Sequence, residues 1–257
     1  MTILVALLPS MFLIACSYWL SKGMLVRRHC LWTGILCGGV SVGVTIILLY
    51  AIKFVLDIVG YEAGLEDTPE RILVGAFWLA AIPEEDSKMV ALCVLIAWNG
   101  VPKNRTEGIV YATYIAATFA GIENVLCLTT ETENIGTVAV IRAFISVPGH
   151  YFDAVFMGYF FSNAFIYKVW WKKIYYGLLA ISVPILLHGL FDGLLMTKYL
   201  GTQYIPLAVV SFFLFYGHLA KTAIQKCWRV KSISLGRGTS VEQHPNINWQ
   251  ENTIIWG

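Results

Sequence analysis

Charged residues are scarce in this sequence. Asp, Glu, Lys and Arg make up 13% of its 257 residues, against about 25% in soluble domains, whereas 58% are hydrophobic. The mean hydropathy is +0.68. This composition excludes a soluble domain and indicates an integral membrane protein.

Cysteine pairs and internal repeats are also missing. The 6 cysteines are scattered and form no Cys-x-x-Cys pair, so neither a disulfide framework nor a thiolate zinc site is expected. No His-x-x-x-His occurs, which argues against a zinc-dependent lipid hydrolase of the membrane. No repeated half is visible, which argues against a transporter built from inverted repeats.

Seven stretches are long and apolar enough to cross a bilayer, since a helical span needs about 20 mainly apolar residues. They are 2–20, 31–56, 72–98, 108–129, 141–167, 175–197 and 204–224. We therefore expect an all-α, polytopic membrane protein with about seven transmembrane helices in one integral-membrane domain, residues 1–225. Residues 226–257 are polar and are expected to form a flexible cytoplasmic tail.

Lysine and arginine gather after alternate spans. Basic residues follow the first, third, fifth and seventh spans, whereas the loops after the second and fourth spans carry acidic residues. Because basic residues stay on the cytoplasmic side, we expect a multi-pass protein with its N-terminus outside and its C-terminus in the cytoplasm.

The third span holds the most informative group of residues. Glu84 and Glu85 lie side by side in it, and Asp86 and Lys88 follow within one turn. A charged residue at the centre of a membrane helix costs about 2.5–3.5 kcal/mol on insertion scales, so such a group indicates a functional site. Lys88 shares a helix face with both glutamates, and its ammonium can lie between their carboxylates. Pro83 removes a helix hydrogen bond and predicts a kink beside them.

The other spans carry few ionisable residues, and these fall at similar depths. The set is Glu123 with Asn124, then Arg142, His150 and Asp153, then His188 and Asp192. Counted at about 1.5 Å per residue from the outer span ends, the acids and imidazoles lie within roughly 11 Å of one another in depth. We expect them to meet in one cavity in the outer half of the membrane.

Each of these residues also has a purely structural interpretation. Glu84 with Lys88 could be a buried ion pair, His150 an interior hydrogen-bonded histidine, and Glu123 a link between helices. His218, in the seventh span, is expected to be structural. A shared depth across four helices is not expected of independent structural pairs, and it favours one functional site.

In chain order the residues form four motifs. They are Glu-Glu-x-x-Lys at 84–88, Phe-x-x-x-Glu-Asn at 119–124, Arg142 followed by His-x-x-x-Ala at 150–154, and His-x-x-x-Asp at 188–192. This ordered set resembles the PrsW family of intramembrane proteases, a distant relative of the CAAX-processing and bacteriocin-processing proteases. The resemblance covers residues 72–197, and the spacing to Lys88 favours the PrsW branch.

The resemblance implies a hydrolase of the glutamic type in a bacterial cell membrane. It would cleave a membrane-tethered protein near the extracytoplasmic side, and a regulator such as an anti-sigma factor is one substrate class. The implied catalytic residues are Glu84, Glu85, Glu123, His150, His188 and Asp192, supported by Lys88, Asn124 and Arg142.

The resemblance also implies a role for each of these residues. Glu84 or Glu85 would be the general base, while Glu123 and His150 hold the attacking water. His188, oriented by Asp192, would polarise the scissile carbonyl or stabilise the oxyanion. Asn124 is a candidate donor to the oxyanion.

The predictions of the cofactor and of the function each have an alternative. Water activation without a metal is the first expectation, and the alternative is a zinc site held by Glu84, Glu123, His150 and His188, whose side chains are common zinc ligands. A proton-coupled transporter, a lipid hydrolase and a binding protein are the competing functions. The expected partners are the lipid bilayer and a membrane-tethered protein substrate, with no nucleic acid. The substrate, the scissile bond and the oligomeric state stay open.

Overall fold

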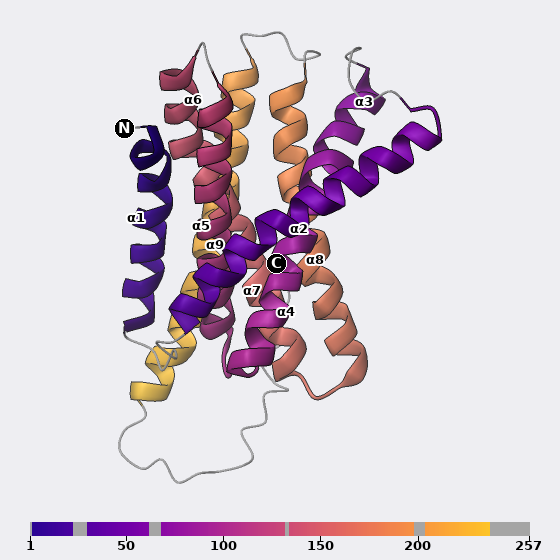
Figure 1. Ribbon diagram of the computed structural model, residues 1–257. Coiled ribbons are helices and arrows are strands. Elements are labelled where there is room, and N and C mark those ends of the chain that lie inside the picture. The colour runs from indigo at the N-terminus through magenta and orange to yellow at the C-terminus, as the bar shows by residue number, and fades with distance from the viewer. Residues whose placement is uncertain (1, 23–29, 62–67, 132–133, 198–203, 237–257) are drawn as a thin grey trace.

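The computed structural model describes residues 2–22, 30–61, 68–131, 134–197 and 204–236 (Figure 1). These residues form helices and contain no β-strand, which confirms the all-α prediction. The elements are α1 (Thr2–Lys22), α2 (Cys30–Ile58), α3 (Pro69–Leu73), η1 (Val74–Ala81), α4 (Ile82–Asn99), α5 (Arg105–Thr130), α6 (Ile135–Ile141), η2 (Arg142–Ser146), α7 (Val147–Ile166), α8 (Trp170–Met196) and α9 (Ile205–Gly236).

The elements join into seven helical stretches, because α3, η1 and α4 are contiguous and so are α6, η2 and α7. Five helices in the described residues are long and apolar enough to cross a membrane: Cys30–Ile58, Arg105–Thr130, Ile135–Ile166, Trp170–Met196 and Pro206–Gln225. The apolar part of α1 is shorter, Ile3–Trp19, and the stretch that ends in α4 carries the acidic motif. The protein is therefore a multi-pass membrane protein, and the count of seven spans stays a prediction.

α5 is the central helix of the bundle. It packs against α1, α2, α4, α7 and α9, and most of it is buried. Small residues allow this close packing. A Cβ at Gly158 of α7 would lie 2.6 Å from the Cα of Ile109, and a Cβ at Gly38 of α2 would lie 2.6 Å from the carbonyl oxygen of Ile115. Figure 1 shows α2 crossing the bundle obliquely, while α1 stands at its side.

Two π-helical segments, η1 and η2, each end two residues before a proline, Pro83 and Pro148. In each, the N–H that follows the segment bonds to the carbonyl five residues earlier, from Ile82 to Phe77 and from Val147 to Arg142. Proline has no N–H and its ring clashes with a carbonyl of the preceding turn, so a wider turn upstream relieves the clash. The kink predicted at Pro83 thus takes the form of a π-helical segment.

Helix ends follow the local sequence. Asn104 begins α5, because its side-chain oxygen accepts a hydrogen bond of 2.9 Å from the N–H of Glu107. Gly100, with φ of +83°, ends α4. α9 continues to Gly236, so residues 226–236, predicted to begin a flexible tail, are helical. The rest of the predicted tail, 237–257, lies outside the described residues.

Candidate active site

A cavity of about 240 Å³ opens between α4, α5, α7, α8 and α9, with η1 and η2 at its wall. It collects polar side chains from segments far apart in the sequence. Those that line it are Glu84, Glu123, Arg142, Ser146, His150, Asp153, His188, Asp192 and Tyr216. Acids and imidazoles from four predicted spans therefore line one cavity, as predicted from their similar depths.

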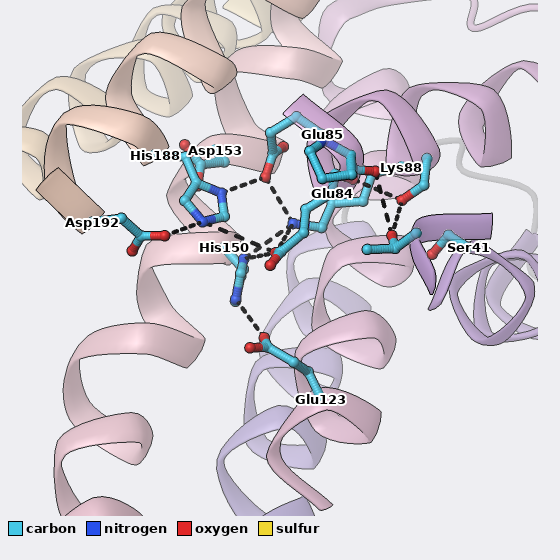
Figure 2. Close-up of polar contacts among 12 residues, drawn as sticks. Ser41, Glu84, Glu85, Lys88, Glu123, His150, Asp153, His188 and Asp192 are labelled. Carbon is cyan, nitrogen blue, oxygen red and sulfur yellow. Dashed lines mark hydrogen bonds and ion pairs between the residues drawn. The ribbon is translucent and has the colours of Figure 1, made fainter. Parts of the chain in front are cut away.

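Glu85 is buried and does not line the cavity. Figure 2 shows its contacts with Lys88 and His188. Its Oε1 accepts hydrogen bonds from Nζ of Lys88 at 2.7 Å and from Nδ1 of His188 at 2.9 Å. The Lys88 ammonium also lies 3.5 Å from Oε2 of Glu84, so it sits between both carboxylates as predicted. The ring of Phe119, the first residue of its motif, lies 4.2 Å from Nζ of Lys88.

Glu84 faces the cavity with a buried carboxylate oxygen that makes no hydrogen bond. This Oε2 lies 3.5 Å from Nζ of Lys88, 3.9 Å from Nδ1 of His150 and 4.0 Å from Nε2 of His188. Contacts of this length leave space for a small polar ligand, and an unbonded buried carboxylate favours one. Of the two adjacent glutamates, Glu84 is therefore the one placed to accept a proton or to bind a cation.

His150 has a partner on each ring nitrogen. Its Nε2 lies 2.9 Å from Oε2 of Glu123, and its Nδ1 lies 3.1 Å from Nζ of Lys88. Because an ammonium only donates, Nδ1 accepts from Lys88 and the protonated Nε2 donates to Glu123. The ring also packs edge to face on Phe119 and on His188, with centroids 5.7 Å and 5.2 Å away. The imidazole is thus held on several sides.

Arg142 contacts Glu123, the carboxylate partner of this imidazole, and Asn124 in turn contacts Arg142. Nη2 of Arg142 lies 2.8 Å from Oε1 of Glu123, and its Nε donates to Oδ1 of Asn124 at 2.6 Å. Nδ2 of Asn124 donates to the backbone carbonyl of Ala6 in α1 at 3.2 Å. Both polar atoms of Asn124 are engaged and the residue does not line the cavity, so these contacts do not support its expected role as oxyanion donor, which stays a prediction.

His188 lies among four carboxylates, of which Glu84 is described above. Its Nδ1 is 2.9 Å from Oε1 of Glu85 and 3.8 Å from Oδ2 of Asp153, and its Nε2 is 3.4 Å from Oδ2 of Asp192. Asp192 contacts this imidazole as predicted from its spacing of four residues. The shorter contact, however, comes from Glu85 on α4, so Glu85 is the main orienting group.

The site includes two residues that were not among the expected catalytic or supporting residues. Asp153 is buried one turn after His150 and accepts a hydrogen bond from the hydroxyl of Tyr216 on α9. Tyr216 is itself buried, with its ring stacked on Phe156 at 5.7 Å between centroids. The spacing from His150 to Asp153 was a usable signal in the sequence. Tyr216 had none, because only the fold brings α9 to this cavity.

Two other ionisable residues of the spans do not join the site. Asp86 is half-buried and does not line the cavity, and no hydrogen bond to another described residue is found for it. His218 is exposed on α9, away from the cavity residues. The structure therefore gives Asp86 no role in the cluster.

The donor set fits a divalent metal ion. Glu84, Glu85, His150 and His188 offer ligand atoms within 4.8 Å of one another. Each imidazole has a carboxylate within 2.9 Å of one nitrogen, as metal-binding histidines commonly do, and its other nitrogen lies within 4.0 Å of Oε2 of Glu84. In His150 this second nitrogen accepts a hydrogen bond from Lys88, which a metal ion would have to replace. Glu123, expected as a zinc ligand, is not in this group and instead lies behind His150.

The chain is similar to proteases of one family. A sequence profile described as "PrsW family intramembrane metalloprotease" matches residues 27–217, which include the whole cavity and leave out α1. A protein named Protease PrsW from Clostridioides difficile (strain 630) is 33% identical over 130 residues, or 50% of this chain and 55% of that protein.

Two further relatives carry the same name. The Geobacillus kaustophilus (strain HTA426) protein is 29% identical over 167 residues, 65% of this chain and 70% of that protein. The Oceanobacillus iheyensis protein is 32% identical over 135 residues, 52% of this chain and 60% of that protein. The chain therefore spans little more than half the length of two of these three relatives. No solved structure matches it significantly.

Proposed function

The chain belongs to the PrsW family of intramembrane proteases, and we propose that it hydrolyses a peptide bond in a membrane-tethered protein. The observation that carries this proposal is the unbonded Oε2 of Glu84, which faces a cavity shared with His150 and His188. Peptide hydrolysis requires a base, a water and a donor for the oxyanion within one enclosed site. Glu84 can act as the base, a histidine can act as the donor, and the cavity has room for the water.

Glu84 is the proposed general base. It takes a proton from a water in the cavity while the water oxygen bonds to the scissile carbonyl carbon. The carbonyl oxygen becomes an oxyanion, for which the imidazolium form of His188 is the proposed donor: its Nδ1–H donates to Glu85 and its Nε2–H is left for the oxyanion. When the C–N bond breaks, protonated Glu84 returns the proton to the leaving amine. One water is consumed, and a new carboxyl terminus and a new amino terminus are released.

Lys88 is the proposed electrostatic support of this reaction. Glu85 and His150 hold its ammonium at 2.7 Å and 3.1 Å, which fixes a positive charge 3.5 Å from the oxygen of Glu84. A fixed charge in a site of low dielectric stabilises an oxyanion without any rearrangement of the protein. Glu85 therefore acts through Lys88 and His188 rather than on the water.

A metal-dependent version of the reaction would use the same cluster. Glu84, His150 and His188 would hold a zinc ion, with Glu123 and Glu85 orienting the two imidazoles. A bound zinc ion would polarise the scissile carbonyl and make water a stronger nucleophile. We put the metal-free version first, because Lys88 already supplies a cation within 3.5 Å of both glutamates.

We further propose that the site opens toward the extracytoplasmic side. Glu123 and Asp192 lie near the C-terminal ends of α5 and α8, which share one end of the bundle, at the top of Figure 1. The described basic residues of the short turns, Lys103 and Lys168, lie at the other end. A membrane-bound regulator such as an anti-sigma factor is the proposed substrate class, and it rests on the family resemblance.

The test compares membranes of cells that produce the wild-type protein or the Glu84→Gln variant at equal levels. Quantitative mass spectrometry of protein N-termini should find at least one membrane protein that accumulates uncleaved with the variant. This protein, called the trapped substrate below, should show a new N-terminus near the outer end of its span with the wild type. Identical N-termini in both membranes would overturn the proposal.

A further inference from the structure

Helix α1 lies outside the residues that the family profile matches, yet it contacts residues of the site. Its buried residues are Ala6, Ser10 and Ser17, all of them small. Ser10 packs on Gly121 of α5, where an added Cβ would lie 3.1 Å from the Cβ of Ser10. Small residues on both helices therefore bring the two backbones close together.

Pro9 removes one backbone hydrogen bond from α1. A proline has no N–H to donate to the carbonyl four residues earlier, here that of Val5. In a membrane, backbone groups in such a turn must find partners on neighbouring helices. The carbonyl next to that of Val5 in the sequence, that of Ala6, accepts the hydrogen bond from Nδ2 of Asn124 at 3.2 Å.

A continuous series of contacts links this carbonyl to the imidazole of His150. Asn124 binds Arg142 at 2.6 Å, Arg142 binds Glu123 at 2.8 Å, and Glu123 binds Nε2 of His150 at 2.9 Å. Asn124 is almost completely buried and does not line the cavity, whereas the side chains of Arg142 and Glu123 are 15% and 29% exposed and do line it. Water cannot easily replace the link from Asn124 to α1, so a shift of α1 is passed on through Asn124 to Arg142 and Glu123.

A second contact joins α1 to the same helix as His150. The hydroxyl of Ser17 donates to the hydroxyl of Tyr151 at 3.1 Å, and Tyr151 directly follows His150 in α7. Helix α1 therefore contacts the helices of the site at two positions along its length: Ala6 contacts α5, and Ser17 contacts α7.

We propose that α1 is a positioning element of the active site. Its docking on α5 sets the orientation of His150 through Asn124, Arg142 and Glu123, the set called the relay below. With the relay intact, Nδ1 of His150 points to Lys88 beside the oxygen of Glu84. When α1 shifts, Asn124 loses its acceptor and the imidazole loses its fixed position. The effect on catalysis rests on the proposed function, whereas the effect on His150 does not.

The test moves α1 without replacing any relay residue. Gly121→Ala places a methyl group against Ser10, so α1 must shift by a few tenths of an ångström. The double variant Ser10→Gly with Gly121→Ala exchanges the two small residues and restores the space. The matched control is Gly43→Ala in α2, where an added Cβ meets no atom within 4 Å.

Two measurements are made on the purified full-length protein. The first is the rate at which diethyl pyrocarbonate modifies His150, followed by peptide mass spectrometry, with exposed His218 as the internal reference. The second is kcat and KM for the trapped substrate. Gly121→Ala should raise the modification rate several-fold and lower kcat about 10-fold at constant KM, since a 1 Å misplacement can cost about 100-fold.

The exchange variant should recover both values, and Gly43→Ala should match the wild type. The proposal is overturned if Gly121→Ala lowers only the melting temperature and leaves the His150 modification rate and kcat unchanged, because α1 would then merely pack against the bundle. If the wild type fails to cleave the trapped substrate, the proposed function fails. The modification rates still decide the role of α1 in that case.

Discussion

Replacing Glu84 or Glu85 by glutamine should impair different properties of the protein. Glu84 lines the cavity, where its Oε2 makes no hydrogen bond, whereas Glu85 does not line it and its Oε1 is bonded to Lys88 and His188. Glutamine keeps the size of the side chain and removes its charge. Glu84→Gln should therefore abolish catalysis, and Glu85→Gln should mainly destabilise the fold.

The expected magnitudes follow from these contacts. Glu84→Gln removes a general base, so kcat should fall by about 10² to 10⁴. Its free energy of unfolding should change by less than about 1 kcal/mol, because no hydrogen bond is lost and Lys88, which loses an ion pair of 3.5 Å, keeps its closest anion, Glu85. Glu85→Gln leaves the buried ammonium of Lys88 without its closest anion, which should cost about 3–5 kcal/mol of stability.

The assay measures kcat on the trapped substrate and the melting temperature of the same detergent-solubilised protein. The wild-type protein is the reference for both values, and the Gly43→Ala variant controls for the handling of a substituted protein. If Glu84→Gln keeps wild-type turnover, or if Glu85→Gln melts at the wild-type temperature, the division of roles between these residues is refuted.

Three further predictions follow from the cavity and the topology. Tyr216→Phe leaves its buried carboxylate partner on α7 without a donor and should cost about 1–3 kcal/mol of stability, measured by denaturant unfolding. Gly149 lines the cavity, so Gly149→Leu should fill it and abolish cleavage. Gly136→Leu is the control outside the cavity and should leave cleavage unchanged, because an added Cβ at either glycine meets no atom within 4 Å. In a cysteine-free background, a membrane-impermeant maleimide added to intact cells should label Glu131→Cys, predicted to be outside, and should not label Lys103→Cys, predicted to be cytoplasmic. If only Lys103→Cys is labelled, the predicted orientation is wrong.

Metal dependence has its own test on the purified protein. Cleavage of the trapped substrate is measured before and after treatment with a zinc chelator, and zinc is then added back. The metal-free version predicts no change in the rate. Loss on chelation with recovery on added zinc would favour the zinc version, in which Glu84, His150 and His188 hold the ion.

Hydropathy predicts the helices well because it reports burial in lipid. The span predicted at 31–56 is Cys30–Ile58 in the structure, and the one predicted at 108–129 is Arg105–Thr130. The end of α9 was misplaced, since a polar composition does not by itself end a helix that leaves the bilayer. The two π-helical segments were not predicted, because they depend on how the preceding turn accommodates a proline.

For the site, spacing along one helix predicts only the contacts within that helix. The placement of Lys88 between two glutamates and the contact of Asp192 with His188 both follow from it. Contacts between helices do not, so neither Glu85 as the closest partner of His188 nor Tyr216 on α9 could be derived. The same limit applies to Asn124, whose partner Ala6 lies 118 positions earlier.

The most direct measurement is an electron cryo-microscopy structure of the Glu84→Gln variant with the trapped substrate bound. The account predicts a substrate backbone carbonyl inside the cavity of about 240 Å³, between residue 84 and the imidazole of His188. A substrate bound elsewhere, with no peptide bond within reach of either residue, would contradict it.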